Sequence, residues 1–268
     1  MTKNINLFIL NLLHDMNNIA YGTYRLRGQK CYDVVKFAIQ NGYRTIDTAE
    51  LYKNHEYVGK AIRDCISEGV VKRNDLTIIS KIHNEHQRNG TIKESCQQII
   101  NELNIGYVDI ILLHTPHKKY YIDSYDQLNE FYKNNKQFVK HIGVSNFDIE
   151  HLNKLSSKPY MNQIELSMFN QRKNLVKYCN DQNIIVQAHS CLTNKKKCNN
   201  QKLIDYSVQN KIPVHEIMIR WCLNKKICVV IGSQNYDNIL KNIKIDVDGQ
   251  LNFEWDDEHF FIYKSFDW

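Results

Sequence analysis

The chain has 268 residues, of which 43% are hydrophobic and 24% charged, and its formal net charge is +6. This length suits one large α/β barrel or two ordinary domains, and no linker or break in composition divides the chain, so we expect a single domain over residues 1–268. The mild positive charge is spread along the sequence, which argues against a face that binds nucleic acid.

Eight short apolar runs are typical of β-strands, and each is followed by a stretch with the helical spacing of apolar residues. The expected strands are Ile19–Gly22, Arg44–Asp47, Leu76–Lys81, Val108–His114, Phe138–Ser145, Met161–Leu166, Ile184–Ala188 and Ile227–Ile231. The expected helices are Cys31–Gln40, Asn54–Glu68, Thr91–Leu103, Tyr125–Asn134, Asp148–Leu155, Leu175–Gln182, Lys202–Gln209 with Val214–Asn224, and Asp237–Ile243.

Repeated strand–helix alternation predicts a parallel sheet, and eight units fit an α/β fold of the (β/α)8 TIM-barrel type. A doubly wound open sheet is the rival, but its usual glycine-rich turn, Gly-x-Gly-x-x-Gly, does not occur in the sequence. Ahead of the first strand, Leu7–Leu13 favours a short N-terminal hairpin over a secretory signal. After Asn242 we expect a short C-terminal tail, in which Trp255, Phe260 and Phe261 predict either the packing of a final helix or part of a pocket wall.

Cysteine usage and hydropathy narrow the class of protein further. The eight cysteines form no Cys-x-x-Cys and no paired Cys/His spacing, a pattern that favours reduced thiols in a cytoplasmic protein. The His-rich segment His83–His86 lacks a third convergent ligand, so no metal site is expected. No apolar stretch approaches the ~20 residues that cross a bilayer. We expect a monomer without membrane or nucleic-acid partners.

Three polar residues each follow one of the consecutive apolar strands. Asp47, Lys81 and His114 stand at the downstream ends of three strands, and Tyr52 lies in the loop after the first of these. In barrels of this type the strand carboxyl ends and the loops that follow them converge at one rim, where catalytic groups are found. The sequence thus predicts a site assembled from these four side chains.

Four segments in the same order resemble motifs of the aldo-keto reductases. They are Gly42–Glu56 (GYRTIDTAELYKNHE), Leu112–His114 (LLH), Gly143–Phe147 (GVSNF) and Asn162–Glu165 (NQIE). The similarity extends from about Gly22 to Asn242. It implies a (β/α)8 barrel that binds a nicotinamide cofactor without a Rossmann fold and reduces the carbonyls of aldehydes or ketones to alcohols.

The resemblance places the family's catalytic tetrad on Asp47, Tyr52, Lys81 and His114. A phenol is a poor acid at neutral pH because its ordinary pKa is about 10. A buried ammonium at Lys81 would lower the pKa of Tyr52 and make it a general acid, while Asp47 would keep Lys81 charged. His114 would donate a hydrogen bond that orients the substrate oxygen.

The resemblance also implies a set of cofactor contacts. Ser145, Asn146 and Gln163 match the side chains that hydrogen-bond the nicotinamide carboxamide, and His189 stands where the family usually stacks a tyrosine on the ring; an imidazole can still stack. The full set comprises Gly22, Thr23, Tyr24, Asp47, Ser145, Asn146, Gln163, His189, Ser190, Leu192, Ile231, Gly232, Ser233, Asn238 and Asn242.

Two positions depart from the family pattern at the adenosine end. The lysine that typically clamps the 2′-phosphate is replaced by Gly232, and a later arginine by Asn238. Loss of these cations weakens discrimination for the 2′-phosphate. Many members of the family with Gly-Ser at this position still use the phosphorylated cofactor, so the resemblance implies NADPH first, with NADH close behind. The run Lys195–Lys197 is either a solvated loop or a segment that folds over the pyrophosphate and restores part of the charge.

The resemblance to the family defines the substrate-binding residues less well than the cofactor contacts. Tyr24 is a plausible pocket residue, and His83 and Thr115 appear where the family often places tryptophans after its third and fourth strands. Surface-loop roles for these residues stay open. The departures at His189, Gly232 and Asn238 also leave open a second function, a cofactor-binding regulatory or scaffold protein built on the same barrel.

Overall fold

The computed structural model describes residues 18–246, 249–251 and 254–262. Eight parallel strands close into a barrel in chain order, and β1 pairs with β8 to complete the ring. The strands are β1 (Ile19–Gly22), β2 (Thr45–Asp47), β3 (Thr77–Ile82), β4 (Val108–Leu113), β5 (Val139–Ser145), β6 (Met161–Glu165), β7 (Ile185–His189) and β8 (Cys228–Ile231). The predicted (β/α)8 barrel is confirmed, and each strand lies within two residues of its expected bounds.

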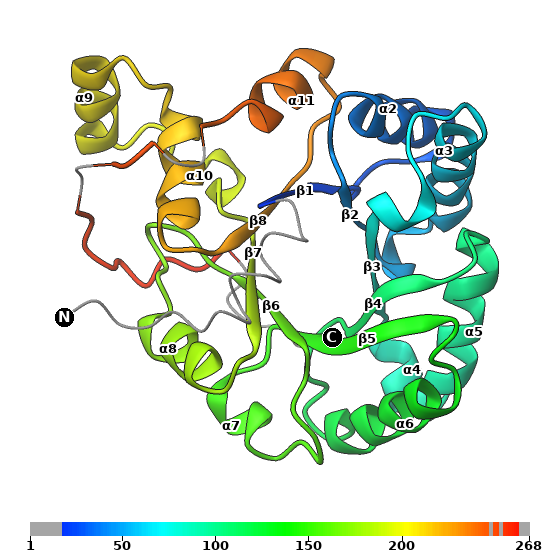
Figure 1. Cartoon of the computed structure of the whole chain (residues 1–268). Helices are drawn as coiled ribbons and strands as arrows, with labels where there is room; N and C mark the ends of the chain where they lie inside the picture. The colour runs from blue at the N-terminus through cyan, green and yellow to red at the C-terminus, as the bar shows by residue number, and fades with distance from the viewer. Residues whose placement is uncertain (1–17, 247–248, 252–253, 263–268) are drawn as a thin grey trace.

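Helices surround the barrel, as Figure 1 shows. They are α2 (Gly28–Gln40), α3 (His55–Ser67), α4 (Asn84–Asn89), α5 (Ile92–Leu103), α6 (Tyr121–Asn134), α7 (Ile149–Leu152), α8 (Lys173–Asp181), α9 (Gln201–Asn210), α10 (Val214–Asn224) and α11 (Tyr236–Ile243), with single 3-10 turns η1 (Glu50–Tyr52), η2 (Arg73–Asp75) and η3 (Thr193–Lys195). Helix α9 lies at the periphery beside α10 (Figure 1).

The two faces of each strand contribute to two separate hydrophobic clusters. Outward-facing strand residues and one stripe of each helix form the main core between the sheet and the helical ring. A second, smaller cluster inside the barrel consists of Ile79, Ile110, Leu112, Met161 and Ile185. Seven of the eight cysteines are buried and all eight are unpaired, as expected for small core residues.

Three expectations from the sequence need correction or lie outside the described residues. Helix α4 has no counterpart among the predicted helices, because its buried residues, Asn84 and Gln87, are polar and give no apolar period. No helix forms over residues 254–262, where Trp255 is instead buried in the main core and packs edge-on against Phe169, at 5.0 Å between ring centroids. The expected N-terminal hairpin lies outside the described residues.

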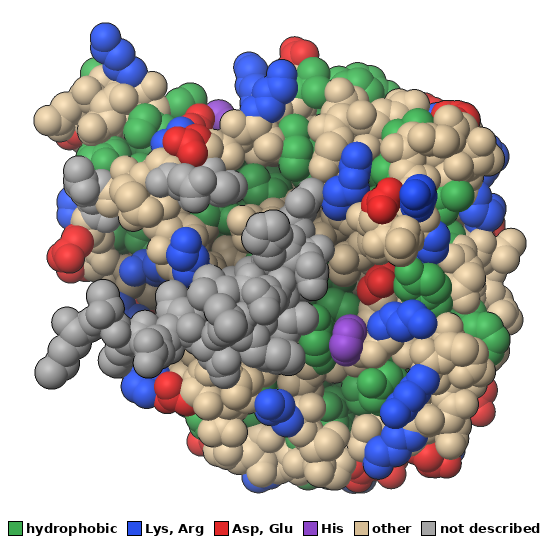
Figure 2. Space-filling view, in the orientation of Figure 1, with side chains coloured by type: hydrophobic (Ala, Val, Ile, Leu, Met, Phe, Trp, Pro, Cys, Tyr) green, Lys and Arg blue, Asp and Glu red, His purple; other side chains and the backbone are tan. Residues whose placement is uncertain are grey.

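The surface shows mixed charge. On the face drawn in Figure 2, lysine and arginine side chains stand among acidic and neutral ones rather than gathering in one patch. Among the helices of the described residues, none is both long and apolar enough to cross a membrane.

Candidate active site

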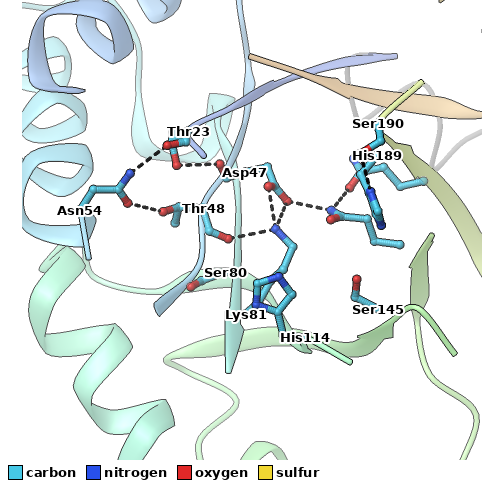
Figure 3. A network of polar contacts seen from close by, with 12 residues as sticks. Thr23, Asp47, Thr48, Asn54, Ser80, Lys81, His114, Ser145, His189 and Ser190 are labelled. Atoms are coloured by element: carbon cyan, nitrogen blue, oxygen red, sulfur yellow. Dashed lines mark hydrogen bonds and ion pairs between the residues drawn. The ribbon is translucent and has the colours of Figure 1, made fainter. Parts of the chain in front are cut away.

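The ends of β2 and β3 bring a buried ion pair into the barrel. Lys81 Nζ lies 2.6 Å from Oδ1 and 2.7 Å from Oδ2 of Asp47, and it also donates to the Thr48 carbonyl at 3.1 Å (Figure 3). Both side chains are almost fully buried. The register pairs Asp47 with Ile79, and Lys81 lies two residues further on the same inward face of β3, which is why two positions 34 residues apart meet.

Burial acts on the protonation of Lys81. Loss of solvent lowers the pKa of Lys81, and the Asp47 carboxylate opposes that shift through its charge and hydrogen bonds. A buried ammonium is tolerated when its partner has good geometry and both oxygens are engaged. The contact with both carboxylate oxygens therefore favours the ammonium form of Lys81 inside the barrel.

Tyr52 lies next to this cation. It ends η1, and Lys81 Nζ is 5.3 Å from the centroid of the Tyr52 ring, close enough for charge to act on the phenol. The ring is 5.9 Å from the His114 ring and 5.2 Å from the Tyr24 ring, centroid to centroid. Glu50, the first residue of η1, anchors this turn: its carboxylate accepts from the His83 backbone N–H at 2.9 Å. The structure thus brings the four expected catalytic side chains together.

His114 follows β4 and faces the same space. Burial, and then the charge of Lys81, hold the pKa of His114 well below its ordinary value, so its ring is neutral. Its Nδ1 has no hydrogen-bond partner among the described residues. A neutral imidazole carries a single N–H, which suits donation to one oxygen of a bound molecule.

Asp47, Tyr52 and His114 border a cavity of about 890 Å³ that reaches from Tyr52 and His114 to the first turn of α11. The three expected substrate residues, Tyr24, His83 and Thr115, line it. Fourteen of the fifteen expected cofactor residues line it as well: Gly22, Tyr24, Asp47, Ser145, Asn146, Gln163, His189, Ser190, Leu192, Ile231, Gly232, Ser233, Asn238 and Asn242.

Thr23 and Lys81 do not line the cavity. Thr23 is buried, and its hydroxyl donates to the Asp47 carbonyl at 3.0 Å, so it supports the end of β2. Asn54 adds to this support, donating to the Thr23 carbonyl at 3.0 Å and accepting from the Thr48 hydroxyl at 2.8 Å (Figure 3). Thr23 and Asn54 therefore support the wall of the cavity from behind.

The amide of Gln163 has a fixed orientation. Its Nε2 donates to Asp47 Oδ2 at 2.7 Å and to Gln187 Oε1 at 2.6 Å. A carboxylate only accepts, so Nε2 must face Asp47, and both of its hydrogens are used. Gln163 Oε1 is thereby left as the acceptor that this side chain can offer to a ligand.

Asn146 and His189 form a second ordered pair. Asn146 Nδ2 donates to the His114 carbonyl at 3.2 Å and to Ser145 Oγ at 3.1 Å, so Asn146 Oδ1 must accept from His189 Nε2 at 2.8 Å. Burial, with a smaller contribution from Lys81, lowers the pKa of His189 to about 3, so its ring is neutral with the proton on Nε2. The amide hydrogens of Asn146 are thus spent within the protein.

The end of the cavity next to α11 is closely packed. A Cβ atom on Gly232 would lie 2.6 Å from the Gly22 carbonyl oxygen, so glycine at this position permits close approach of β1 to the residue after β8. Tyr21 fixes the same segment by donating to the Ser233 carbonyl at 2.6 Å. The side chain of Asn235 caps α11 by accepting from the Asn238 N–H at 3.2 Å.

The lysines of the run Lys195–Lys197 lie in different surroundings. Lys195 lines the cavity, whereas Lys197 pairs with Glu258 at 2.5 Å and packs over the Phe260 ring. Arg25 also lines the cavity and was missed, although it directly follows Tyr24 in the sequence. Gln187 was missed too; the signal was its place two residues before His189, on the same inward-facing side of β7.

The histidines near the mouth do not form a metal site within the described part of the chain, where no cluster of three or more suitable ligands occurs. His86 Nε2 pairs with Glu50 Oε1 at 2.8 Å, and its Nδ1 contacts the Thr91 hydroxyl at 2.8 Å. His86 therefore braces η1 from outside.

Comparison with known proteins agrees with the geometry. Residues 18–256 match the model of the aldo/keto reductase family. A glyoxal reductase of Bacillus subtilis is 35% identical over 236 residues, covering 86% of this chain and 83% of that protein, and a 9,11-endoperoxide prostaglandin H2 reductase of Trypanosoma cruzi is 30% identical, covering 91% and 87%. The crystal structure of an aldo-keto reductase from a Medee basin deep-sea metagenome library superposes with a TM-score of 0.82 at 28% identity, over 94% of this chain and 95% of that one.

The fold and the match together define the class of protein: this chain belongs to the aldo/keto reductase family. It is accordingly an NAD(P)H-dependent oxidoreductase that acts on small carbonyl compounds.

Proposed function

We propose that the protein reduces aldehydes and ketones to alcohols with Tyr52 as the proton donor. The observation that carries the proposal is the buried Asp47–Lys81 ion pair, with Lys81 Nζ 5.3 Å from the Tyr52 ring, beside a cavity bordered by His114. A bound reduced nicotinamide supplies the hydride for carbonyl carbon. The chain's own residues have to supply the proton and stabilise the charge that develops on oxygen.

Each of the four side chains has a separate task. Tyr52 gives its phenolic proton to the substrate oxygen, and the Lys81 ammonium stabilises the negative charge that the phenol oxygen then acquires. Asp47 holds Lys81 in place and charged. His114, being neutral, donates its single N–H to the substrate oxygen and orients the carbonyl toward Tyr52.

The free polar atoms of the cavity fit a nicotinamide carboxamide. Such a group offers an NH2 donor and a carbonyl acceptor. Gln163 Oε1 is the matching acceptor, and Ser145, whose Oγ accepts from Asn146, keeps its hydroxyl hydrogen as the matching donor. His189, held edge-on by Asn146, presents an aromatic face for the ring.

Cofactor preference follows from the cations that line the cavity. Arg25 and Lys195 carry charge that acts on any phosphate, whereas Gly232 and Asn238 carry none at the positions where the family clamps the 2′-phosphate. We propose NADPH as the first cofactor, with NADH accepted at a modest disadvantage. Fluorescence titration with both nucleotides measures the difference directly.

Tyr52→Phe tests the proposal. The variant keeps the ring and loses the proton, so we expect a fall in kcat of about a thousandfold with cofactor binding retained. Tyr57→Phe, on an exposed tyrosine of α3 outside the cavity, is the matched control. Near-normal turnover by Tyr52→Phe would contradict the mechanism. Tight cofactor binding by the unaltered protein without turnover of any aldehyde would favour the scaffold function instead.

A further inference from the structure

Behind the cavity wall, the amide of Gln87 can adopt only one orientation. Its Nε2 donates to the Thr115 carbonyl at 2.8 Å, and its Oε1 accepts from the His117 backbone N–H at 3.2 Å. A carbonyl can only accept and an N–H can only donate, so exchanging the amide nitrogen and oxygen would break both hydrogen bonds. The backbone therefore sets the direction of this hydrogen-bond chain.

That direction passes to Asn84 and then to Thr115. The second hydrogen of Gln87 Nε2 goes to Asn84 Oδ1 at 3.0 Å, which turns Asn84 Nδ2 toward the Thr115 hydroxyl oxygen. In this contact Asn84 must be the donor and Thr115 the acceptor. Gln87, Asn84 and Thr115 are each about 2% exposed, so water competes little for these groups.

The hydroxyl hydrogen of Thr115 is consequently not used by this chain of hydrogen bonds. Among the described residues, the Thr115 hydroxyl donates to no side chain or carbonyl. Thr115 and Asn84 both line the cavity. A buried hydroxyl hydrogen without an acceptor is unfavourable. Thr115 lines the cavity, so this hydrogen can be directed into it, and there it would meet a substrate.

We infer that the Thr115 hydroxyl donates to a second oxygen of the substrate, so that the preferred substrates are carbonyl compounds with an oxygen on the neighbouring carbon, such as hydroxyaldehydes and 2-oxoaldehydes. Thr115 directly follows His114, and consecutive Cα atoms are about 3.8 Å apart. Both residues line the same cavity, so a donor at Thr115 can serve an oxygen close to the one that His114 holds. This inference rests on the proposed carbonyl reduction.

The first test compares glycolaldehyde with propanal, which have similar size and differ by a hydroxyl in place of a methyl group. The measured quantity is the ratio of the two kcat/KM values, each expressed per free aldehyde. We expect the unaltered protein to favour glycolaldehyde by about tenfold, the worth of one hydrogen bond. Thr115→Val should bring the ratio close to one, and Thr115→Ser, which keeps the hydroxyl, should hold it within about twofold.

A second variant changes the direction of the hydrogen bond without removing the hydroxyl. In Asn84→Asp the carboxylate can only accept, so it takes the Thr115 hydroxyl hydrogen away from the cavity while still accepting from Gln87. We expect the glycolaldehyde preference to fall as it does in Thr115→Val. Thermal unfolding of each variant checks that the fold is retained, and Asn84→Asp keeps the test decisive if Thr115→Val fails to fold.

The possible failures are distinguishable. If both aldehydes are reduced and neither Thr115→Val nor Asn84→Asp alters the ratio, this inference is overturned and the proposed reductase stands. If the unaltered protein binds cofactor but reduces neither aldehyde, nor any other carbonyl compound, the proposed function falls and the inference falls with it.

Discussion

Asp47 and Lys81 meet through both oxygens of the carboxylate and one ammonium, at 2.6 and 2.7 Å, in a part of the barrel almost closed to solvent. Each charge is tolerated because the other is present. Removal of one partner therefore differs in kind from removal of both, and this difference can be measured.

Asp47→Asn should destabilise the fold by about 3–5 kcal/mol, because it leaves a buried ammonium without its counter-charge. The double variant Asp47→Asn with Lys81→Met, which removes both charges, should lose less. Urea unfolding at pH 7 gives both values. If the single variant proves as stable as the double, the pair does not carry the charge assigned to it.

Stability should fall in mild acid because of the two neutral histidines. The pKa of His189 is lowered from 6.5 to about 3, and that of His114 is lowered well below 6.5. As the pH drops below 6.5, the unfolded chain therefore takes up protons that the folded chain does not, and the free energy of unfolding decreases.

His189→Gln should flatten this dependence by up to about 1.4 kcal/mol per pH unit between pH 6 and 4. Urea unfolding at pH 7, 6, 5 and 4 measures the slope, and His259→Gln, on an exposed ring, is the control. An identical slope in the His189 variant and the unaltered protein would contradict the neutral state of this ring.

Asn238→Arg should improve discrimination for NADPH. Asn238 is exposed in the first turn of α11 and lines the cavity, so a guanidinium there can reach a 2′-phosphate without displacing buried groups. We expect NADPH to bind about tenfold more tightly and NADH to change little, with Asn238→Gln as the uncharged control. An equal gain for both nucleotides would show that the added charge acts on the shared phosphates.

Lys195→Ala should weaken NADPH and NADH binding to a similar extent, about three- to tenfold at low salt, and the loss should shrink as salt is added. The matched control is Lys197→Ala, since Lys197 is paired with Glu258 and does not line the cavity. Fluorescence titrations at two salt concentrations suffice. Equal affinities for the Lys195 variant and the unaltered protein would exclude this lysine from the cofactor site.

The strands could be predicted because each is a short apolar run, and several of them end at a polar residue, as at Asp47 and His114. Helix α4 could not be predicted, since its buried side chains are amides whose partners lie on another loop. Trp255 was expected either on a final helix, because large apolar residues usually mark an amphipathic element, or in a pocket wall; here it lies outside any helix and packs edge-on against Phe169.

The candidate site could also be predicted only in part. Which residues line the cavity could be inferred from motifs, but the direction of their hydrogen bonds could not. Gln187 is an isolated polar residue in an apolar strand, and its contact with Gln163 depends on two strands being in register. The states of Asn146 and His189 likewise depend on a carbonyl, that of His114, whose position only the folded backbone specifies.

The close approach at Gly22 and Gly232 limits how this enzyme can change during evolution or engineering. Any larger residue at position 232 would collide with a main-chain oxygen that cannot rotate away, so a lysine introduced there would force two neighbouring strands apart. Descendants of this sequence that gain stricter nucleotide selectivity should acquire it through substitutions along α11, and a directed library is best concentrated there.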